Sequence, residues 1–460
     1  MSRALVLTLA AATLACSVWR RTPPPAPPAP ALPPAPATRR LVVADVPLHF
    51  TPITRPGAGP RSVALGLSLR LGHASDPPDR PGLSALLLGL LRGHDEREGS
   101  LAAALADLGG APQLHISSSG ALLATEVPAE HAPAALRALL AAIRRPLDQP
   151  GDAAELAAEL ADITAELAAA RARARDDPTT LALAGLRRVS LPPGHPHATS
   201  ELSSGTWSLE QVREHGQRSL GPAALTIVVA GDADPQALVA AAAPGLAGWS
   251  GPADPQGLPA LAPAPRRAIH RIARPGLAQA VVVLGRAAAI ADDDLATQVA
   301  ADIVQSALGE RLRDDMAATY GVEVSREPAR GPGLLRIVTQ VDAAAVGRSL
   351  GVIADTLARL RRQGLAPGLV ARVCVHEALE QLYRRQTDAD QLQSLARAHW
   401  HALPNARPPP CDAAAVTRSL RSHFALDDLQ IVVVGDPSLV DAPLADLDLG
   451  PIVDLPAASL

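Results

Sequence analysis

The order of apolar and polar residues repeats between the two halves of this chain. A short apolar strand closed by glycine is predicted at Leu65–Gly72 and again at Ala280–Gly285. A second apolar strand, ending in Gly-Asp, is predicted at Thr226–Asp232 and again, 204 residues later, at Gln430–Asp436. Because a period of about 200 residues is far longer than that of a solenoid repeat, the pattern indicates an internal duplication.

Helical and alternating patterns occupy the rest of the first half. Apolar residues alternate with polar ones over Gln113–Val127, which predicts further strands. Helices with apolar residues three and four positions apart are predicted at 82–91, 100–108, 132–143 and 152–175. Mixed strands with segregated helices predict the α+β class, with two homologous α/β-sandwich domains related by the duplication.

The first residues predict export from the cytoplasm. Arg3 precedes an apolar run that is too short to remain as a membrane span, so residues 1–15 are predicted to be a signal peptide. The run ends in Thr-Leu-Ala-Cys, which is similar to the cleavage box of bacterial lipoproteins and predicts lipidation of Cys16. Ordinary signal cleavage a few residues earlier, with Cys16 incidental, is the alternative.

Proline, alanine and glycine mark the expected domain boundaries. Residues 16–39 would carry the lipid and a stiff Pro/Ala-rich spacer. A second Pro/Gly/Ala-rich stretch at 249–266 is predicted to be the interdomain linker. The N-terminal domain then spans 40–248 and the C-terminal domain spans 267–460.

Composition excludes several classes of protein. Hydrophobic residues make up 48% of the chain, enough for real cores, so wholesale disorder is excluded. The net charge of −4 offers no basic surface for nucleic acid. Cys374 and Cys411 stand at unrelated positions, and free, partly buried thiols are expected, with a disulfide as the alternative.

A series of short motifs in the first half adds more specific information. In order along the chain these are Gly82-Leu83, Arg92-Gly93, Gly109-Gly110 and the turn Gly194-His195-Pro196-His197. Their order and spacing resemble the insulinase/pitrilysin family of metallopeptidases, over essentially the whole body of the chain. In that family the helix that lies between the Gly-Leu pair and the following glycine carries His-x-x-Glu-His, in which two histidines bind zinc and the glutamate activates water.

This chain lacks the zinc-binding residues that the resemblance leads one to expect. The His-x-x-Glu-His positions are occupied by Ala85, Leu88 and Gly89, none of which can bind a metal. The family's third ligand corresponds to Glu166, and a second acidic position corresponds to Glu159; ordinary surface glutamates are the alternative. A lone carboxylate does not hold zinc tightly, so no cofactor is expected, although relatives use zinc.

The second half carries a further match. Arg313 and Tyr320 resemble the family's Arg/Tyr pair, which helps to position the scissile carbonyl of the substrate. Tyr320 is one of only two tyrosines in the chain, which makes a chance match less credible. A solvated arginine and a core or rim tyrosine are the alternative.

The resemblance therefore implies a pseudopeptidase that forms half of a clamshell. Such a lipoprotein would face the periplasm from the inner or outer membrane, bind unfolded peptide, and supply the Arg/Tyr pair to a zinc-bearing subunit in a heterodimer. One alternative is a stand-alone peptide-binding or scaffold protein of the envelope. A less favoured alternative is an active zinc metalloendopeptidase that uses other residues.

Overall fold

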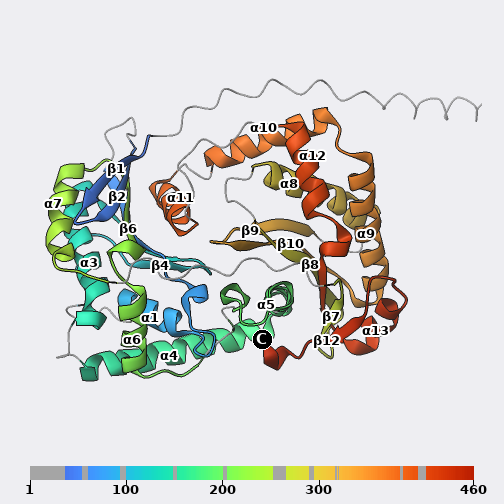
Figure 1. Cartoon of the computed structure of the whole chain (residues 1–460), viewed down its shortest axis with the longest axis horizontal. Coiled ribbons are helices and arrows are strands. Elements are labelled where there is room, and N and C mark those ends of the chain that lie inside the picture. The colour runs from blue at the N-terminus through green and yellow to red at the C-terminus, as the bar shows by residue number, and fades with distance from the viewer. Residues whose placement is uncertain are drawn as a thin grey trace, which may run out of the picture.

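Two mixed β-sheets, each with its own layer of helices, form the two halves of the protein (Figure 1). A computed structural model of the chain describes residues 37–53, 61–93, 100–148, 153–199, 202, 205–251, 266–289, 295–315, 319, 321–383, 387–401 and 411–460. The predicted α+β class and the two duplicated α/β sandwiches are confirmed. The predicted signal peptide, Cys16, almost all of the spacer and most of the interdomain linker lie outside the described residues.

The first half contains six strands and seven helices among the described residues. The strands are β1 (Arg39–Val43), β2 (Val46–Pro52), β3 (Ser62–Leu69), β4 (Gln113–Ile116), β5 (Ala121–Pro128) and β6 (Leu225–Gly231). The helices are α1 (Leu83–Arg92), α2 (Leu101–Ala106), α3 (Ala132–Asp148), α4 (Ala153–Asp176), α5 (Pro178–Ser190), α6 (Leu209–Ser219) and α7 (Pro235–Leu246).

The second half follows the same plan in the residues that are described. Its strands are β7 (Ile269–Ala273), β8 (Gln279–Ala289), β9 (Val322–Glu327), β10 (Pro332–Asp342), β11 (Gln430–Gly435) and β12 (Ile452–Asp454). Its helices are α8 (Leu295–Gly309), α9 (Val346–Gln363), α10 (Pro367–Tyr383), α11 (Asp388–Trp400), α12 (Ala413–His423) and α13 (Pro437–Ala445).

The two sheets share one topology. In space the strands run β1-β2-β6-β3-β5-β4 in the first sheet and β12-β7-β11-β8-β10-β9 in the second. Strands β6 and β11 are therefore equivalent, and so are β3 and β8, as the repeated sequence patterns predict. The outer edge differs, because β1 pairs antiparallel with β2 whereas β12, near the C-terminus, pairs parallel with β7.

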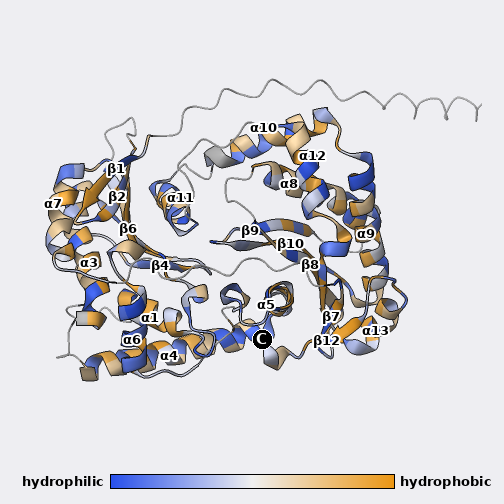
Figure 2. Cartoon of the chain, in the orientation of Figure 1, coloured by the Kyte–Doolittle hydropathy of each residue, from blue (hydrophilic) through white to orange (hydrophobic). Residues whose placement is uncertain are grey.

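Hydrophobic residues gather inside both halves. Figure 2 shows them along the strands of both sheets, while the helices carry hydrophilic residues on one side. Strands β6 and β11 are buried along their whole length. Unbroken apolar strands of this kind are typical of sheets covered on both faces. Among the described residues, no helix has the length and apolar content needed to cross a membrane.

The second face of the first sheet is covered by α11, a helix of the second half. The buried residues of this contact are Ala64, Leu122, Ala124 and Val228 of the sheet and Leu392, Leu395, Ala396 and Trp400 of α11. The indole Nε1 of Trp400 donates to the Ala121 carbonyl at 3.2 Å, and Ser68 Oγ lies 2.9 Å from His399 Nδ1. In Figure 1, α11 accordingly lies beside the first sheet.

Helix α5 of the first half makes the reciprocal contact. It packs on β7, β8 and β11 of the second sheet. Its buried partners there include Ile272, Val283 and Val432. The carboxylate of Asp177 accepts hydrogen bonds from the first turn of α5, and Pro178 takes the first helical position, so α5 begins as a new helix after α4.

Two details of the second half differ from the expectations. Gly285 does not close its strand, since β8 continues to Ala289. A Cβ at Gly285 would overlap the Leu335 carbonyl and the Leu186 side chain of α5, so the glycine serves close packing instead.

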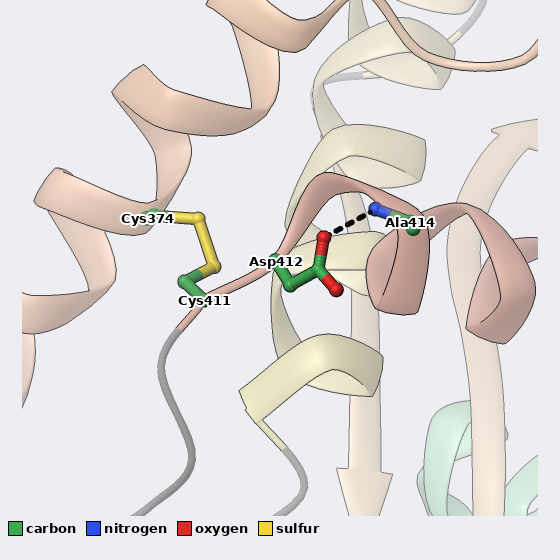
Figure 3. The surroundings of a disulfide bond; sticks show 4 residues. All are labelled: Cys374, Cys411, Asp412 and Ala414. Carbon is green, nitrogen blue, oxygen red and sulfur yellow. Dashed lines mark hydrogen bonds between the residues drawn. A yellow bond between two sulfur atoms is a disulfide. The ribbon is translucent and has the colours of Figure 1, made fainter.

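The expectation of free thiols is also wrong. Cys374 of α10 and Cys411, just before α12, form a disulfide bond (Figure 3). Their separation of 37 residues gave no hint of pairing, because only the fold brings α10 and α12 into contact.

Substituting Gly120 tests how tightly α11 is packed on the first sheet. A Cβ at Gly120 would lie closer than 3.0 Å to three atoms of the Trp400 ring. We therefore expect Gly120→Ala to lower the free energy of unfolding by about 1–3 kcal/mol, measured by urea denaturation. Gly351→Ala is the matched control, because its Cβ would meet no atom within 4 Å on α9. Equal stability of the two variants would contradict the close packing.

Candidate functional site

Helix α1 begins at a tight turn held by one carboxylate. Gly82 precedes the helix with φ of 92°, in the left-handed region that favours glycine. The Asp76 carboxylate accepts hydrogen bonds from the backbone N–H of Gly82 at 2.6 Å and of Ser84 at 2.7 Å. It thereby satisfies donors at the start of α1, where the helix dipole favours a negative charge.

A buried histidine fastens α1 to α6. Ser84 Oγ lies 2.9 Å from His215 Nε2. Burial lowers the pKa of His215 to about 4, and burial also raises the pKa of Asp76 despite its hydrogen bonds. His215 is therefore neutral at neutral pH, so its 3.8 Å approach to Asp76 is no salt bridge. Because Ser84 is fully buried, this Ser–His–Asp set is structural and meets no substrate.

The three zinc-motif positions of α1 face the protein interior. Ala85 is 5% exposed and Leu88 is 0% exposed. A Cβ at Gly89 would lie 2.7 Å from Cγ2 of Ile163, on α4. The isoleucine thus occupies the space into which a metal-binding side chain at position 89 would extend.

The two acidic residues named with the motif lie seven residues apart on α4, on one side of the helix. Glu159 is buried and lies 3.4 Å from Arg145; its Oε1 is 3.7 Å from where a Cβ on Gly93 would stand. Glu166 is half exposed and lies 3.7 Å from Arg92, the last residue of α1. Arginines therefore balance both carboxylates. In the part of the chain that the structure describes, no three His, Cys, Asp or Glu side chains form a metal site.

Arg313 and Tyr320 follow α8, in the opposite half from α1. Arg313 is exposed and lies in a π-helical segment, Glu310–Asp315, that continues α8. Short π-helical segments are rare and often occur at functional sites. Tyr320 lies outside the described residues.

The residues on either side of Tyr320 are tied to β10. The hydroxyl of Thr339 is 3.0 Å from the Thr319 hydroxyl and 2.9 Å from the Gly321 carbonyl. Thr339 is 2% exposed, so these bonds are shielded from water. The sequence gave no reason to single out Thr339, because its partners lie about 20 residues away across a hairpin.

The Gly-His-Pro-His turn lies where the two halves meet. His197 Nε2 is 2.8 Å from the carbonyl of Arg330, in the β9–β10 turn, and Arg187 of α5 forms an ion pair with Glu327 of β9. His73 lies in a short helical turn, His73–Ser75, that contacts the Gly-His-Pro-His turn. Burial lowers the pKa of His197 and of His73 to about 4. The motif predicted the turn, but not these partners, which belong to the other half.

A separate hollow of about 700 Å³ opens in the second half, between α9 and α13. Two arginines and two aspartates line it: Arg311, Arg348, Asp355 and Asp446. The mixed charges select no single class of ligand. The helices that line the hollow, α9 and α13, lie in the other half from α1 (Figure 1).

One family model matches the chain. Residues 206–374, from just before α6 into α10, match the model described as "Peptidase M16 inactive domain". No curated protein matches the chain.

Several solved structures share the fold. The peptidase M16 inactive domain from Pseudomonas fluorescens is 18% identical, with a TM-score of 0.75, and the match covers 87% of this chain and 98% of that chain. A chain of complex III2 from Candida albicans is 14% identical, with a TM-score of 0.72 and coverage of 90% and 98%. A protease from Helicobacter pylori is 12% identical, with a TM-score of 0.72 and coverage of 87% and 100%.

The described residues share the fold of these structures, and α1 lacks zinc-binding side chains at the positions of the family motif. The family match and the shared fold support an insulinase-like family with a degenerate zinc motif, as the sequence resemblance indicated.

Acid should destabilise the packing around the buried histidines. The pKa values of His73, His197 and His215 are about 4, whereas histidine in an unfolded chain titrates near 6.5. Because the unfolded state binds the proton more tightly, this stabilisation is complete above pH 6.5 and is lost as pH falls toward 4. We expect a loss of about 1–3 kcal/mol per histidine by pH ~4.5, partly offset by Asp76, measured by urea denaturation.

Two variants test whether His215 contributes to the loss of stability in acid. His215→Gln should reduce the loss of stability between neutral and acid pH, since it removes one buried titrating group. His115→Gln, at an exposed position on β4, should leave the loss unchanged. The same pH dependence in both variants would rule out His215 as a contributor.

Restoring the ligands tests where the zinc motif lies. Ala85→His and Gly89→His would place two imidazoles one helical turn apart, with Glu166 as the third ligand. Ile163→Ala must accompany them, because Ile163 fills the space beside position 89. We expect this triple variant to bind about one zinc ion per chain, measured by titration calorimetry.

The controls address the third ligand and the available space. Glu166→Ala in the triple variant should weaken zinc binding by about tenfold or more. Keeping Ile163 in the variant with both histidines should also weaken zinc binding, because the side chain of Ile163 then fills the space that the histidine at position 89 needs. Unchanged affinity after Glu166→Ala would show that Glu166 is not at the ligand position.

Proposed function

We propose that this chain is a catalytically inactive envelope protein of the insulinase class that binds unfolded peptides. In this proposal it contributes Arg313 and Tyr320 to the active site of a zinc-bearing partner subunit. The observation that carries the proposal is the filled zinc position: apolar residues replace the ligands on α1, and Ile163 occupies the space beside Gly89. Such a helix cannot activate water with zinc, so in this proposal the partner subunit supplies the zinc that hydrolysis requires.

Peptide binding is supported by the free edge of the first sheet. Strand β4 pairs with β5 on one side and is the last strand in the sheet as described. It lies against α1, with Gln113 and His115 exposed. An extended peptide can add to such an edge through backbone hydrogen bonds, which are independent of its sequence.

Pairing with another subunit is supported by the second half. Arg313 is exposed and lies in the opposite half from α1. Thr339 of β10 contacts the Thr319 hydroxyl and the Gly321 carbonyl, so the segment that follows α8 is joined to the second sheet. The chain from Candida albicans that shares this fold is part of a complex, and the same is proposed here.

We also propose a location in the cell envelope. The apolar N-terminal run and Cys16 favour export and lipidation, and the Pro/Ala-rich spacer would lift the body off the membrane. The Cys374–Cys411 disulfide supports this location, because disulfides persist in oxidising compartments such as the periplasm.

One observation favours the stand-alone alternative, a peptide-binding or scaffold protein of the envelope. Helices α5 and α11 cover the second face of each sheet within a single chain, so the fold does not need a partner to be complete. Co-purification from envelope extracts separates the two functions. A zinc-bearing peptidase-like subunit recovered at one copy per chain supports pairing, and a monomer that binds peptide alone supports the alternative.

Conservative changes at the two tyrosines test the catalytic contribution. In the partnered complex, Tyr320→Phe should lower kcat/KM for peptide hydrolysis by about 10²–10³, because a hydrogen-bond donor to the oxyanion is lost. Tyr383→Phe is the matched control, since Tyr383 lies exposed at the end of α10 and should have no effect. Full activity of the Tyr320→Phe complex would rule out a transition-state role.

A further inference from the structure

The segment that carries α11 leaves the second half of the protein and returns to it. It begins in α10, which packs against α8 and α12, and it ends at Cys411, beside the start of α12. Between these points α11 contacts β3, β5 and β6 of the first sheet. Figure 1 shows α11 beside the first sheet while α10 and α12 remain together with α8.

The disulfide joins the two ends of the segment that carries α11. The Cα atoms of Cys374 and Cys411 lie 6.0 Å apart, and both side chains pack against the core of the second half. Next to Cys411, the Asp412 carboxylate accepts a hydrogen bond from the Ala414 N–H at 2.8 Å and so caps α12 (Figure 3). The bond therefore connects one helix before α11 to one helix after it.

The contact made by α11 is a small one. The apolar cluster that it forms with the first sheet is much smaller than the main core of that half. Polar contacts add to it at both ends of the helix: Ser62 donates to Asp388 at 3.4 Å, and Arg70 donates to the His399 carbonyl at 3.3 Å. Elements with few buried contacts are the first to open in a folded protein.

Helix α5 makes the equivalent contact without a covalent tether. One residue, Asp177, separates α5 from α4, and its side chain caps α5. By contrast, α11 is joined to α10 through residues 384–387 and to Cys411 through residues 401–410. The direct junction with α4 restrains one end of α5, whereas neither end of α11 is joined directly to another helix. An undocked α11 therefore has more conformations open to it, and its docking is opposed by conformational entropy.

A cross-link between the two ends of the segment lowers the conformational entropy of the chain when α11 is undocked. The disulfide closes the segment between Cys374 and Cys411, which limits the conformations open to the chain when α11 is off the sheet. The docked state loses nothing in exchange, because the bond lies within the second half. The bond thus favours the docked position of α11 without touching the first sheet.

We propose that the Cys374–Cys411 disulfide is a redox-sensitive tether that keeps α11 docked on the first sheet and so holds the two halves together. A dithiol reductant opens it by giving up two electrons and two protons. The two cysteines become thiols, and the reductant's two thiols become a disulfide. Reduction then loosens α11 selectively, with no change in the contact made by α5.

Amide hydrogen exchange of the full chain tests the tether, with dithiothreitol as the reductant. In the oxidised protein, peptides from α11 and α5 should both be protected. After reduction, exchange in α11 should become at least about tenfold faster while exchange in α5 stays the same. Unchanged protection of α11, or an equal loss in both helices, would overturn the proposal.

A double variant tests whether the faster exchange in α11 comes from loss of the Cys374–Cys411 bond. Cys374→Ser with Cys411→Ser should show fast exchange in α11 without reductant, and dithiothreitol should add nothing further. A further increase on adding dithiothreitol would contradict the assignment. If the double variant does not fold, reduction of the folded wild-type protein still gives the comparison of α11 with α5.

Discussion

The reciprocal exchange of α5 and α11 is the contact on which the rest of this structure depends. Each sheet has apolar residues on both faces, and its own helices cover only one of them. The remaining face is buried by a helix from the other half. Burial of apolar surface is the main force in folding, so the second face of each sheet is buried only when both halves are in place.

The positions of α1 that correspond to the family's zinc motif belong to the packed interior of the first half. Leu88 and Ala85 turn the ligand face of α1 into core, and Ile163 packs against Gly89. The carboxylates of Glu159 and Glu166 remain beside the helix, but Arg145 and Arg92 now supply the opposing charge. Asp76 and His215 hold the start of this helix through hydrogen bonds to Gly82 and Ser84.

Sequence patterns predicted what depends on local order, and missed what depends on distant contacts. The repeated apolar strands and the motif spacing identified β3 to β6, β8 and β11, the duplication and the altered helix α1. The strands β1, β2, β7, β9, β10 and β12 were not predicted. The exchanged helices look like any amphipathic helix, because the sheet that each one covers lies in the other half of the chain. The same reason hid the Cys374–Cys411 bond and the contact between His197 and Arg330. Spacing along a chain carries no information about such pairs.

The different outer strands of the two sheets bear on how the protein arose. A single half, before duplication, could cover the second face of its sheet only with the matching helix of another copy. The arrangement of α5 and α11 is thus that of a helix-swapped homodimer whose subunits became one chain. Only the outer strands break this symmetry: the first sheet takes its outer strand from the residues before β2, and the second takes its outer strand from the residues after α13.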